Sequence, residues 1–219
     1  MNSILIQTDF DNTLTIGNVS ELIHDEFGPE NWPEIYENYK KGMITVEERN
    51  IFSFKFLKTK KTNLDNFVKK NVKFREGFLE FYKHLMNNNL DFKIVSSGVD
   101  FYIYSALASL NIDPESVEII SGKSTFNSLG IDVQYFDPEN YKINTNFKGI
   151  HTAFHKQKYS RIIYFGDSYT DLNSASISDV IFATDKLQKY YDKEGVDHFP
   201  FENYFEVLHI FKEQNLAKL

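Results

Sequence analysis

The sequence predicts an α/β fold, a doubly wound parallel sheet whose first strand is followed by a small helical insertion. Short runs of β-branched and aromatic residues recur without polar alternation, as expected for strands covered on both faces. Helical patterns separate these runs, which is the order of right-handed βαβ crossovers. One long stretch, residues 16–74, interrupts this rhythm with helical patterns alone.

Five segments are the expected strands. They are "SILIQTD" (3–9), "DFKIVSS" (91–97), "SVEIIS" (116–121), "RIIYFGD" (161–167) and "DVIFAT" (179–184). Each is a short apolar run that ends at polar or small residues, the pattern of a buried strand that leads into a loop.

Helices are expected between the strands, over residues 76–88, 100–111, 146–157 and 170–177. The first places Phe78, Phe81, Tyr82 and Leu85 on one face. Asp100 is the candidate N-cap of the second.

The insertion predicts a second domain. Its four expected helices cover 19–27, 33–42, 45–58 and 64–72, and Thr45 with Glu48 forms a capping-box pattern at the third. We expect a core domain made of residues 1–15 and 75–219 and a helical cap domain made of residues 16–74. A helical insertion directly after the first strand would cover the carboxyl edge of the sheet as a lid. The alternation in "KSTFNSLGIDVQYFD" (123–137) predicts a β-hairpin within the core.

Composition narrows the function classes. The 219 residues include no cysteine, so no disulfide framework or thiolate site is expected. No run approaches the roughly 20 apolar residues of a membrane span, and "SILIQ" runs straight into acids, unlike a signal peptide. The net charge of −7 argues against nonspecific nucleic-acid binding. The expected protein is cytoplasmic and a monomer or a homodimer, without a nucleic acid or a membrane as partner.

Polar side chains follow three of the expected strands. The candidate site residues at these ends are Asp9, Asp11, Ser96, Ser97, Gly98 and Asp167, with Lys148 near the start of a predicted helix. Carboxyl ends of parallel strands meet at one edge of a sheet, where ligands bind. Taken singly, the two aspartates fit a turn and the lysine fits a solvated surface. Their joint occurrence favours a common site. Lys142 and Lys156 are alternatives to Lys148.

This set of side chains suits phosphoryl transfer. Clustered carboxylates require a hard cation, and Mg²⁺ prefers oxygen ligands. One carboxylate can act as a nucleophile that forms an aspartyl-phosphate. A second acid two residues on can protonate the leaving alcohol and then activate water. Ser96 and Lys148 would hold the phosphate oxygens as charge shifts in the transition state.

With "DFDNT", "SSG", a lysine and "GDSYTD" in this order, the chain resembles the haloacid dehalogenase superfamily of phosphatases over most of its length. The resemblance implies a Rossmann-like core and Mg²⁺ as cofactor. It implies that Asp9 is the nucleophile and a metal ligand, and that Asp11 is the general acid and base, with its backbone carbonyl on the metal. The remaining implied roles are phosphate binding for Ser96, Ser97, Gly98, Lys148 and Thr13, metal binding for Asp167, and support of the metal site for Asp171.

The insertion resembles the cap of the phosphoserine-phosphatase branch of this superfamily. "FREGFLEFYKHL", "SSGVDFYIYSAL" and "HFPFENYFEV" are similar to the phosphatases of methionine salvage, which implies an enediol or keto sugar-like phosphate as substrate. Phosphoserine phosphatases usually carry a glutamate in the cap linker, where this chain has Asn18, with Glu21 one helical turn on. The second motif reads Ser-Ser-Gly where Ser-Gly-Gly is commoner, so Ser97 adds a side chain near the phosphate.

Other functions fit parts of the pattern. Phosphoserine phosphatase is the alternative enzyme. A receiver-like signalling domain or a phosphate-binding protein without turnover is the alternative of another class, and Asp11 argues against both because only turnover needs a second acid. His151 and His155 lack a glutamate beside the first histidine, so we expect exposed helix surface there rather than a zinc site. For Arg49 a core-facing or exposed position is favoured over contact with a substrate.

Overall fold

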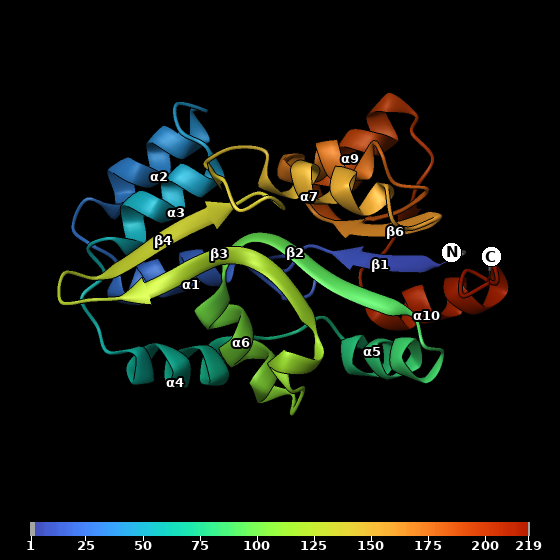
Figure 1. Ribbon diagram of the computed structural model, residues 1–219, viewed down its shortest axis with the longest axis horizontal. Helices are drawn as coiled ribbons and strands as arrows, with labels where there is room; N and C mark the ends of the chain where they lie inside the picture. The colour runs from blue at the N-terminus through green and yellow to red at the C-terminus, as the bar shows by residue number, and fades with distance from the viewer. Residues whose placement is uncertain (1–2, 219) are drawn as a thin grey trace.

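The computed structural model describes residues 3–218, which contain one eight-stranded sheet in the order β5-β4-β3-β2-β1-β6-β7-β8 (Figure 1). Its strands are β1 (Ile4–Thr8), β2 (Asp91–Val99), β3 (Glu118–Phe126), β4 (Ile131–Phe136), β5 (Lys142–Ile143), β6 (Arg161–Gly166), β7 (Val180–Ala183) and β8 (Phe199–Pro200). Six neighbouring strands of the sheet run parallel, in the order β3, β2, β1, β6, β7 and β8. At one edge β4 pairs antiparallel with β3, and β5 pairs antiparallel with β4. The doubly wound α/β prediction and its five strands are confirmed.

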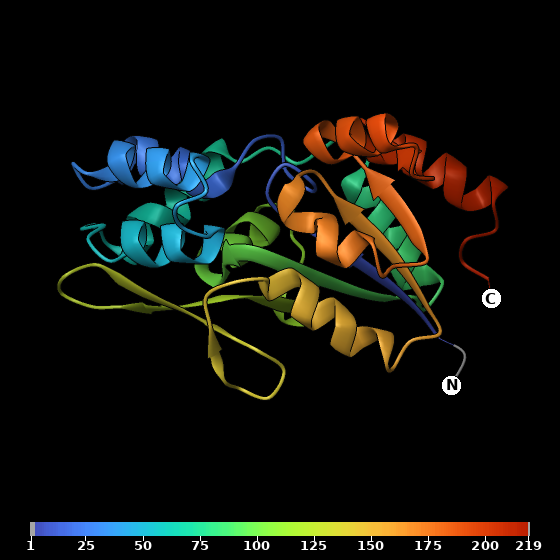
Figure 2. The same ribbon diagram turned by 90° about the horizontal axis from the view of Figure 1, so that it is seen from above.

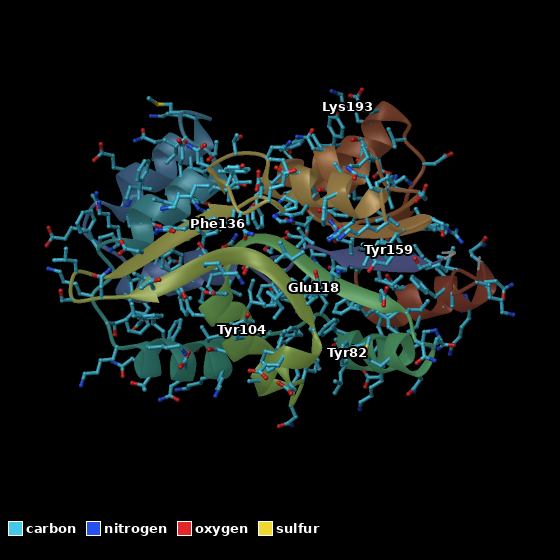
Figure 3. All side chains as sticks on the ribbon, viewed as in Figure 1. Tyr82, Tyr104, Glu118, Phe136, Tyr159 and Lys193 are labelled. Atoms are coloured by element: carbon cyan, nitrogen blue, oxygen red, sulfur yellow. The ribbon has the colours of Figure 1, made fainter. Side chains whose placement is uncertain are left out.

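Helices cover both faces of the sheet (Figures 1 and 2). One face carries α5 (Phe78–Asn87), α6 (Asp100–Ser109) and α10 (Tyr204–Glu213), and the other carries α7 (Phe147–Lys156), α8 (Leu172–Ala175) and α9 (Asp185–Glu194). Two 3₁₀ turns, η1 (Pro114–Ser116) and η2 (Tyr169–Asp171), precede β3 and α8. In Figure 3, Tyr82 and Tyr104 lie with α5 and α6 on one side of the sheet, and Lys193 lies with α9 on the other. This double covering is why the strands read as continuous apolar runs.

Two details of the helices differ from expectation. Val99, rather than Asp100, is the N-cap of α6, because the Asp100 carboxylate accepts hydrogen bonds from the backbone and hydroxyl of Ser124 on β3. The sequence prediction did not include α9 and α10, although the buried residues Tyr204, Val207 and Phe211 of α10 have the spacing of an amphipathic helix.

The insertion folds into α1 (Val19–Phe27), α2 (Trp32–Lys40), α3 (Val46–Phe54) and α4 (Lys61–Asn71). The capping box of Thr45 and Glu48 at α3 is confirmed. The two chain segments that enter and leave the insertion pair with each other, since Ile16 N–H donates to Lys73 and Arg75 N–H donates to Leu14. This pairing agrees with a boundary near residues 15 and 75, and the division into cap and core domains stays a prediction.

The predicted hairpin at 123–137 is confirmed as the outer part of β3 with β4, joined by a turn closed by Asn127 and Gly130. It extends beside the insertion (Figure 2) and contacts α3. A Cβ at Gly130 would lie 2.2 Å from the Lys55 carbonyl oxygen at the end of α3. The hairpin therefore supports the insertion from the core side. In residues 3–218, no helix combines the length and the apolar character that crossing a bilayer requires.

Candidate active site

The site lies at the carboxyl edge of the sheet, where β1 runs between β2 and β6. This arrangement brings together the segments that follow the three strands, as the sequence predicts. A cavity of about 150 Å³ opens there. The core contributes Asp9, Asp11, Asn12, Ser96, Ser97, Gly98, Lys148, Asp167, Ser168, Thr170 and Lys186 to its lining, and the insertion contributes Asn18, Glu21, Tyr36, Tyr39, Lys40, Val46 and Arg49.

A buried lysine joins two of the carboxylates. Lys148 Nζ lies 2.8 Å from Asp9 Oδ2 and 2.8 Å from Asp171 Oδ1. Burial opposes its charge, but the carboxylates of Asp171, Asp9 and Asp167 raise the pKa of Lys148 above its usual range. The ammonium in turn holds the pKa of Asp171 below its usual value against the effect of burial. The lysine is therefore charged and fixed beside Asp9.

Neither alternative lysine reaches this cluster. Lys156 pairs with Asp179 at the far end of α7, and Lys142 lies exposed on β5. Of the three candidates, Lys148 alone contacts Asp9, because it occupies the first turn of α7, whose start faces the sheet edge.

Three carboxylates converge on one point. Single oxygens of Asp9, Asp167 and Asp171 lie within 4.8 Å of one another, and all three residues are buried. Burial raises the pKa values of Asp9 and Asp167, and the neighbouring carboxylates raise them further. Asp9 Oδ1 is buried without a hydrogen-bond partner among the described residues. Such a cluster suits a hard cation such as Mg²⁺, which would offset the repulsion and bind the free oxygen.

Asp171 differs from the other two acids because its oxygens are already bonded. Oδ1 accepts from Lys148 and from the Tyr164 hydroxyl at 2.6 Å, and Oδ2 accepts from the backbone N–H groups of Asp167 and Ser168. These bonds fix the loop after β6. The pattern suits the supporting role expected for Asp171.

Asp11 occupies a different environment from Asp9 although the two are two residues apart. Asp11 Oδ1 accepts from Val19 N–H at 2.6 Å, and Oδ2 accepts from the Tyr102 hydroxyl at 2.8 Å. Burial and the charge of Asp9 raise the pKa of Asp11 to about 6. A carboxyl group with this pKa can be protonated or ionised near neutral pH, as a general acid and base requires.

The Ser-Ser-Gly segment ends β2 beside these acids. Ser96 Oγ accepts from Gly98 N–H at 3.0 Å. A Cβ at Gly98 would lie 2.4 Å from the Tyr102 hydroxyl oxygen, which explains the glycine. The Ser97 hydroxyl donates to Glu47 of α3 at 3.1 Å. Thr13 is fully buried and does not line the cavity.

From the sequence, Asn18, Glu21 and Arg49 of the insertion were considered but not assigned to the site. Arg49 is almost fully buried, yet it lines the cavity and lies 4.8 Å from the ring centre of Tyr39. Glu21 lies opposite, 3.5 Å from Arg49, and accepts from the Tyr36 hydroxyl. The resemblance to enzymes with a helical cap was the available signal, but helical periodicity does not identify the side chains that face a cavity between the insertion and the rest of the chain.

The expectation for the two histidines of α7 was wrong. His151 and His155 are buried, and His155 Nδ1 lies 2.8 Å from Gln7 Oε1 in β1. His151 donates to the Phe136 carbonyl. The signal was Gln7 itself, a polar residue in the middle of a buried strand that requires hydrogen-bond partners from the covering helix.

Comparisons with known proteins agree with this geometry. Residues 6–176 match the haloacid dehalogenase-like hydrolase family. A 2-hydroxy-3-keto-5-methylthiopentenyl-1-phosphate phosphatase of Bacillus velezensis is 31% identical over 209 residues, which cover 93% of this chain and 87% of the relative. A protein of the same name from Bacillus cereus is 28% identical over 222 residues, covering 99% and 100%.

A solved structure, described as a phospho-aspartyl intermediate analogue of phosphoserine phosphatase, superposes with a TM-score of 0.70 at 19% identity, covering 95% of this chain and 99% of that one. The structural likeness establishes the shared fold, and the sequence match covers most of the chain. The chain therefore belongs to the haloacid dehalogenase-like hydrolases and is a phosphatase of that family.

Proposed function

We propose that this enzyme hydrolyses a small phosphorylated metabolite through an aspartyl-phosphate on Asp9. The surroundings of the two Asp9 carboxylate oxygens support this proposal most directly. One oxygen is paired with Lys148 at 2.8 Å and the other is buried without a partner, beside two further acids at the end of a cavity. A buried carboxylate held in this way is poised to react or to bind a cation.

Asp9 and Asp11 divide the chemistry. An Asp9 oxygen attacks phosphorus, and the bond to the leaving alcohol breaks as Asp11 gives that alcohol its proton. Asp11, now a carboxylate, takes a proton from water, whose oxygen attacks the phosphorus of the aspartyl-phosphate. Inorganic phosphate leaves, and Asp9 returns as a carboxylate. Lys148 and Ser96 hold phosphate oxygens, with Ser97, Gly98 and Thr13 shaping the segments around them.

Asp9, Asp167 and the Asp11 backbone carbonyl would hold Mg²⁺, with Asp171 behind them. The cation would neutralise the cluster so that a phosphate dianion can approach. The unpartnered oxygen of Asp9 supports this assignment.

The proposed substrate is a hydroxy-keto or enediol phosphate, which is the class of compound in the names of the two Bacillus relatives. The cavity offers Glu21 and Arg49, each already engaged by the other, and Asn18 in place of a linker glutamate. A neutral oxygen-rich chain suits this lining better than an ammonium group. We also propose that the enzyme works in the cytoplasm, as a monomer or a homodimer, on metabolites rather than nucleic acid.

The test is phosphate release from a panel that includes L-phosphoserine and the methionine-salvage enediol phosphate, with Mg²⁺ and with EDTA. We expect Mg²⁺-dependent release with a preference for the enediol phosphate, and none from Asp9→Asn. A preference for L-phosphoserine would establish the alternative enzyme. No release from any member by folded protein would favour a binding or signalling role.

A further inference from the structure

A single carboxylate of the insertion bonds to both segments that carry the phosphate ligands. Glu47, in the first turn of α3, is buried and 3% exposed. Its Oε1 accepts from the Ser97 hydroxyl at 3.1 Å and from Phe147 N–H at 3.2 Å. Ser97 adjoins Ser96, and Phe147 adjoins Lys148. Glu47 therefore holds the immediate neighbours of both residues to which we assign phosphate binding.

The two donors depend on Glu47. Phe147 is the first residue of α7, and the N–H groups of a first helical turn have no partner within the helix. A carboxylate there is also favoured by the helix dipole. The Ser97 hydroxyl points to this carboxylate, which explains a serine where the commoner motif has glycine: its side chain contacts the insertion.

Further bonds from the same end of α3 fix this position. Asn50 donates to the Ser97 carbonyl at 2.8 Å, which also accepts from the Tyr135 hydroxyl of β4. Thr45 donates to the Asn144 carbonyl at 2.5 Å, and Asn144 donates to Glu48 at 2.8 Å. The start of α3 is thus anchored to the end of β2, to the hairpin and to the loop before α7.

We propose that Glu47 is a positioning residue that makes the alignment of Ser96 and Lys148 depend on the docking of α3. Because the residue acts through Ser97 and Phe147, it needs no contact with the substrate. This proposal rests on the proposed phosphatase chemistry for its kinetic consequence, while its structural consequence is independent of activity.

The experiment compares Glu47→Ala, Glu47→Gln, Ser97→Ala and the Glu47→Ala/Ser97→Ala double variant, with p-nitrophenyl phosphate as substrate. Both bonds end on one oxygen, so glutamine can keep them. We expect kcat/KM to fall about tenfold or more in Glu47→Ala, in line with the cost of misplacing a reacting group, and to stay within about threefold of wild type in Glu47→Gln. The double variant is expected to match Glu47→Ala. Glu26→Ala, which removes an exposed carboxylate of α1, is the matched control.

Hydrogen exchange supplies the readout that needs no turnover. We expect the Phe147 amide to lose protection in Glu47→Ala and to keep it in Glu47→Gln, with β1 and β6 unchanged in both. A wild-type protein without phosphatase activity would refute the proposed function and leave this measurement standing. Wild-type kcat/KM in Glu47→Ala, equal damage in Glu47→Gln, multiplying effects in the double variant, or unchanged protection of Phe147 would each overturn the positioning role.

Discussion

Two aspartates separated by one residue differ because the chain gives them different partners. Asp9 faces Lys148 and two further acids, whereas Asp11 is bonded by the Val19 amide and the Tyr102 hydroxyl. In the first environment the Lys148 ammonium opposes the rise in the pKa of Asp9 that burial and Asp171 cause, and it holds the carboxylate to which we assign attack on phosphorus. Burial and the charge of Asp9 raise the pKa of Asp11 to about 6, against the effect of its two hydrogen bonds, so a proton can be given and recovered near neutral pH. Local environment, rather than residue type, separates the proposed nucleophile from the proposed acid.

The Asp11→Asn variant tests this division. An amide fills the same space but cannot give or take the proton, so we expect kcat to fall by about 10²- to 10⁴-fold, the usual contribution of general acid–base catalysis. The loss should be smaller with p-nitrophenyl phosphate, whose leaving group needs little protonation, than with an alkyl phosphate. Steady-state phosphate release on both substrates measures this difference. Equal losses on both would contradict a role for Asp11 as the acid.

At the scale of single residues, the sequence predicted which candidate site residues lie together, because strand ends converge by topology alone. Asp9 and Asp167 follow β1 and β6, and Ser96 lies near the end of β2. These three strands are neighbours in the sheet, so the proximity of the residues follows from the fold class. Glu47 and Arg49 could not be placed in this way. Their contacts depend on how the insertion packs on the core, and Glu47 lies 50 residues from its partner Ser97.

At the scale of elements, α7 and α1 each bury polar side chains, and the partners of those side chains depend on the element that packs against the helix. On α7, Lys148 faces the acids, while Thr152 and His155 face the sheet and bond to Gln7. Spacing alone does not distinguish such a buried polar face from a solvated one, which is why the two histidines were misassigned. On α1, His24 is buried against Trp32, with ring centres 4.3 Å apart, and its Nδ1–H donates to the Ser20 carbonyl at 2.6 Å.

His24 makes the stability of the insertion depend on pH. Burial lowers its pKa from 6.5 to about 4, so between these values the unfolded chain binds a proton that the folded chain does not. Stability therefore rises with pH across this window and is lost as pH falls below 6.5. At pH 5 the shift corresponds to about 2 kcal/mol.

Urea unfolding followed by Trp32 fluorescence at pH 7.5 and pH 5.0 measures the effect. Wild type is expected to lose more stability between the two pH values than His24→Leu does, by an amount of this order. Other titrating groups are common to both proteins, so the difference isolates His24. The same loss in both would show that His24 does not titrate in this window.

For the molecule as a whole, the alternation of strands and helices predicted the sheet, the parallel direction of its strands and the place of the insertion in the chain. These features follow from local patterns and from the handedness of crossovers. The two-residue strands β5 and β8 are too short to leave a pattern. The packing of the hairpin against α3 could also not be predicted from the sequence. This contact links the edge of the sheet to the insertion, and the edge of the sheet and the insertion together enclose the acids.

That enclosure concentrates negative charge, and the whole molecule should be less stable without a cation. A ligand that binds the folded state adds about 2.7 kcal/mol at a hundredfold excess over its Kd. For a chain of this size each kcal/mol corresponds to roughly 2–4 °C in Tm. We therefore expect saturating Mg²⁺ to raise Tm by about 5–10 °C relative to EDTA.

Asp167→Asn separates the stability effect of the acidic cluster from its function. Burial and the neighbouring carboxylates Asp171 and Asp9 raise the pKa of Asp167, so we expect its charge to oppose folding when no cation is bound. An amide removes that charge at nearly constant volume. In EDTA the variant should melt at or above the wild-type temperature, whereas its response to Mg²⁺ and its phosphatase activity should both be lost. A variant that melts lower than wild type in EDTA, or that keeps the full Mg²⁺ shift, would show that Asp167 serves the fold rather than the cation. The expected combination, higher stability with lost activity, is what a cluster of buried like charges produces when it is kept for chemistry.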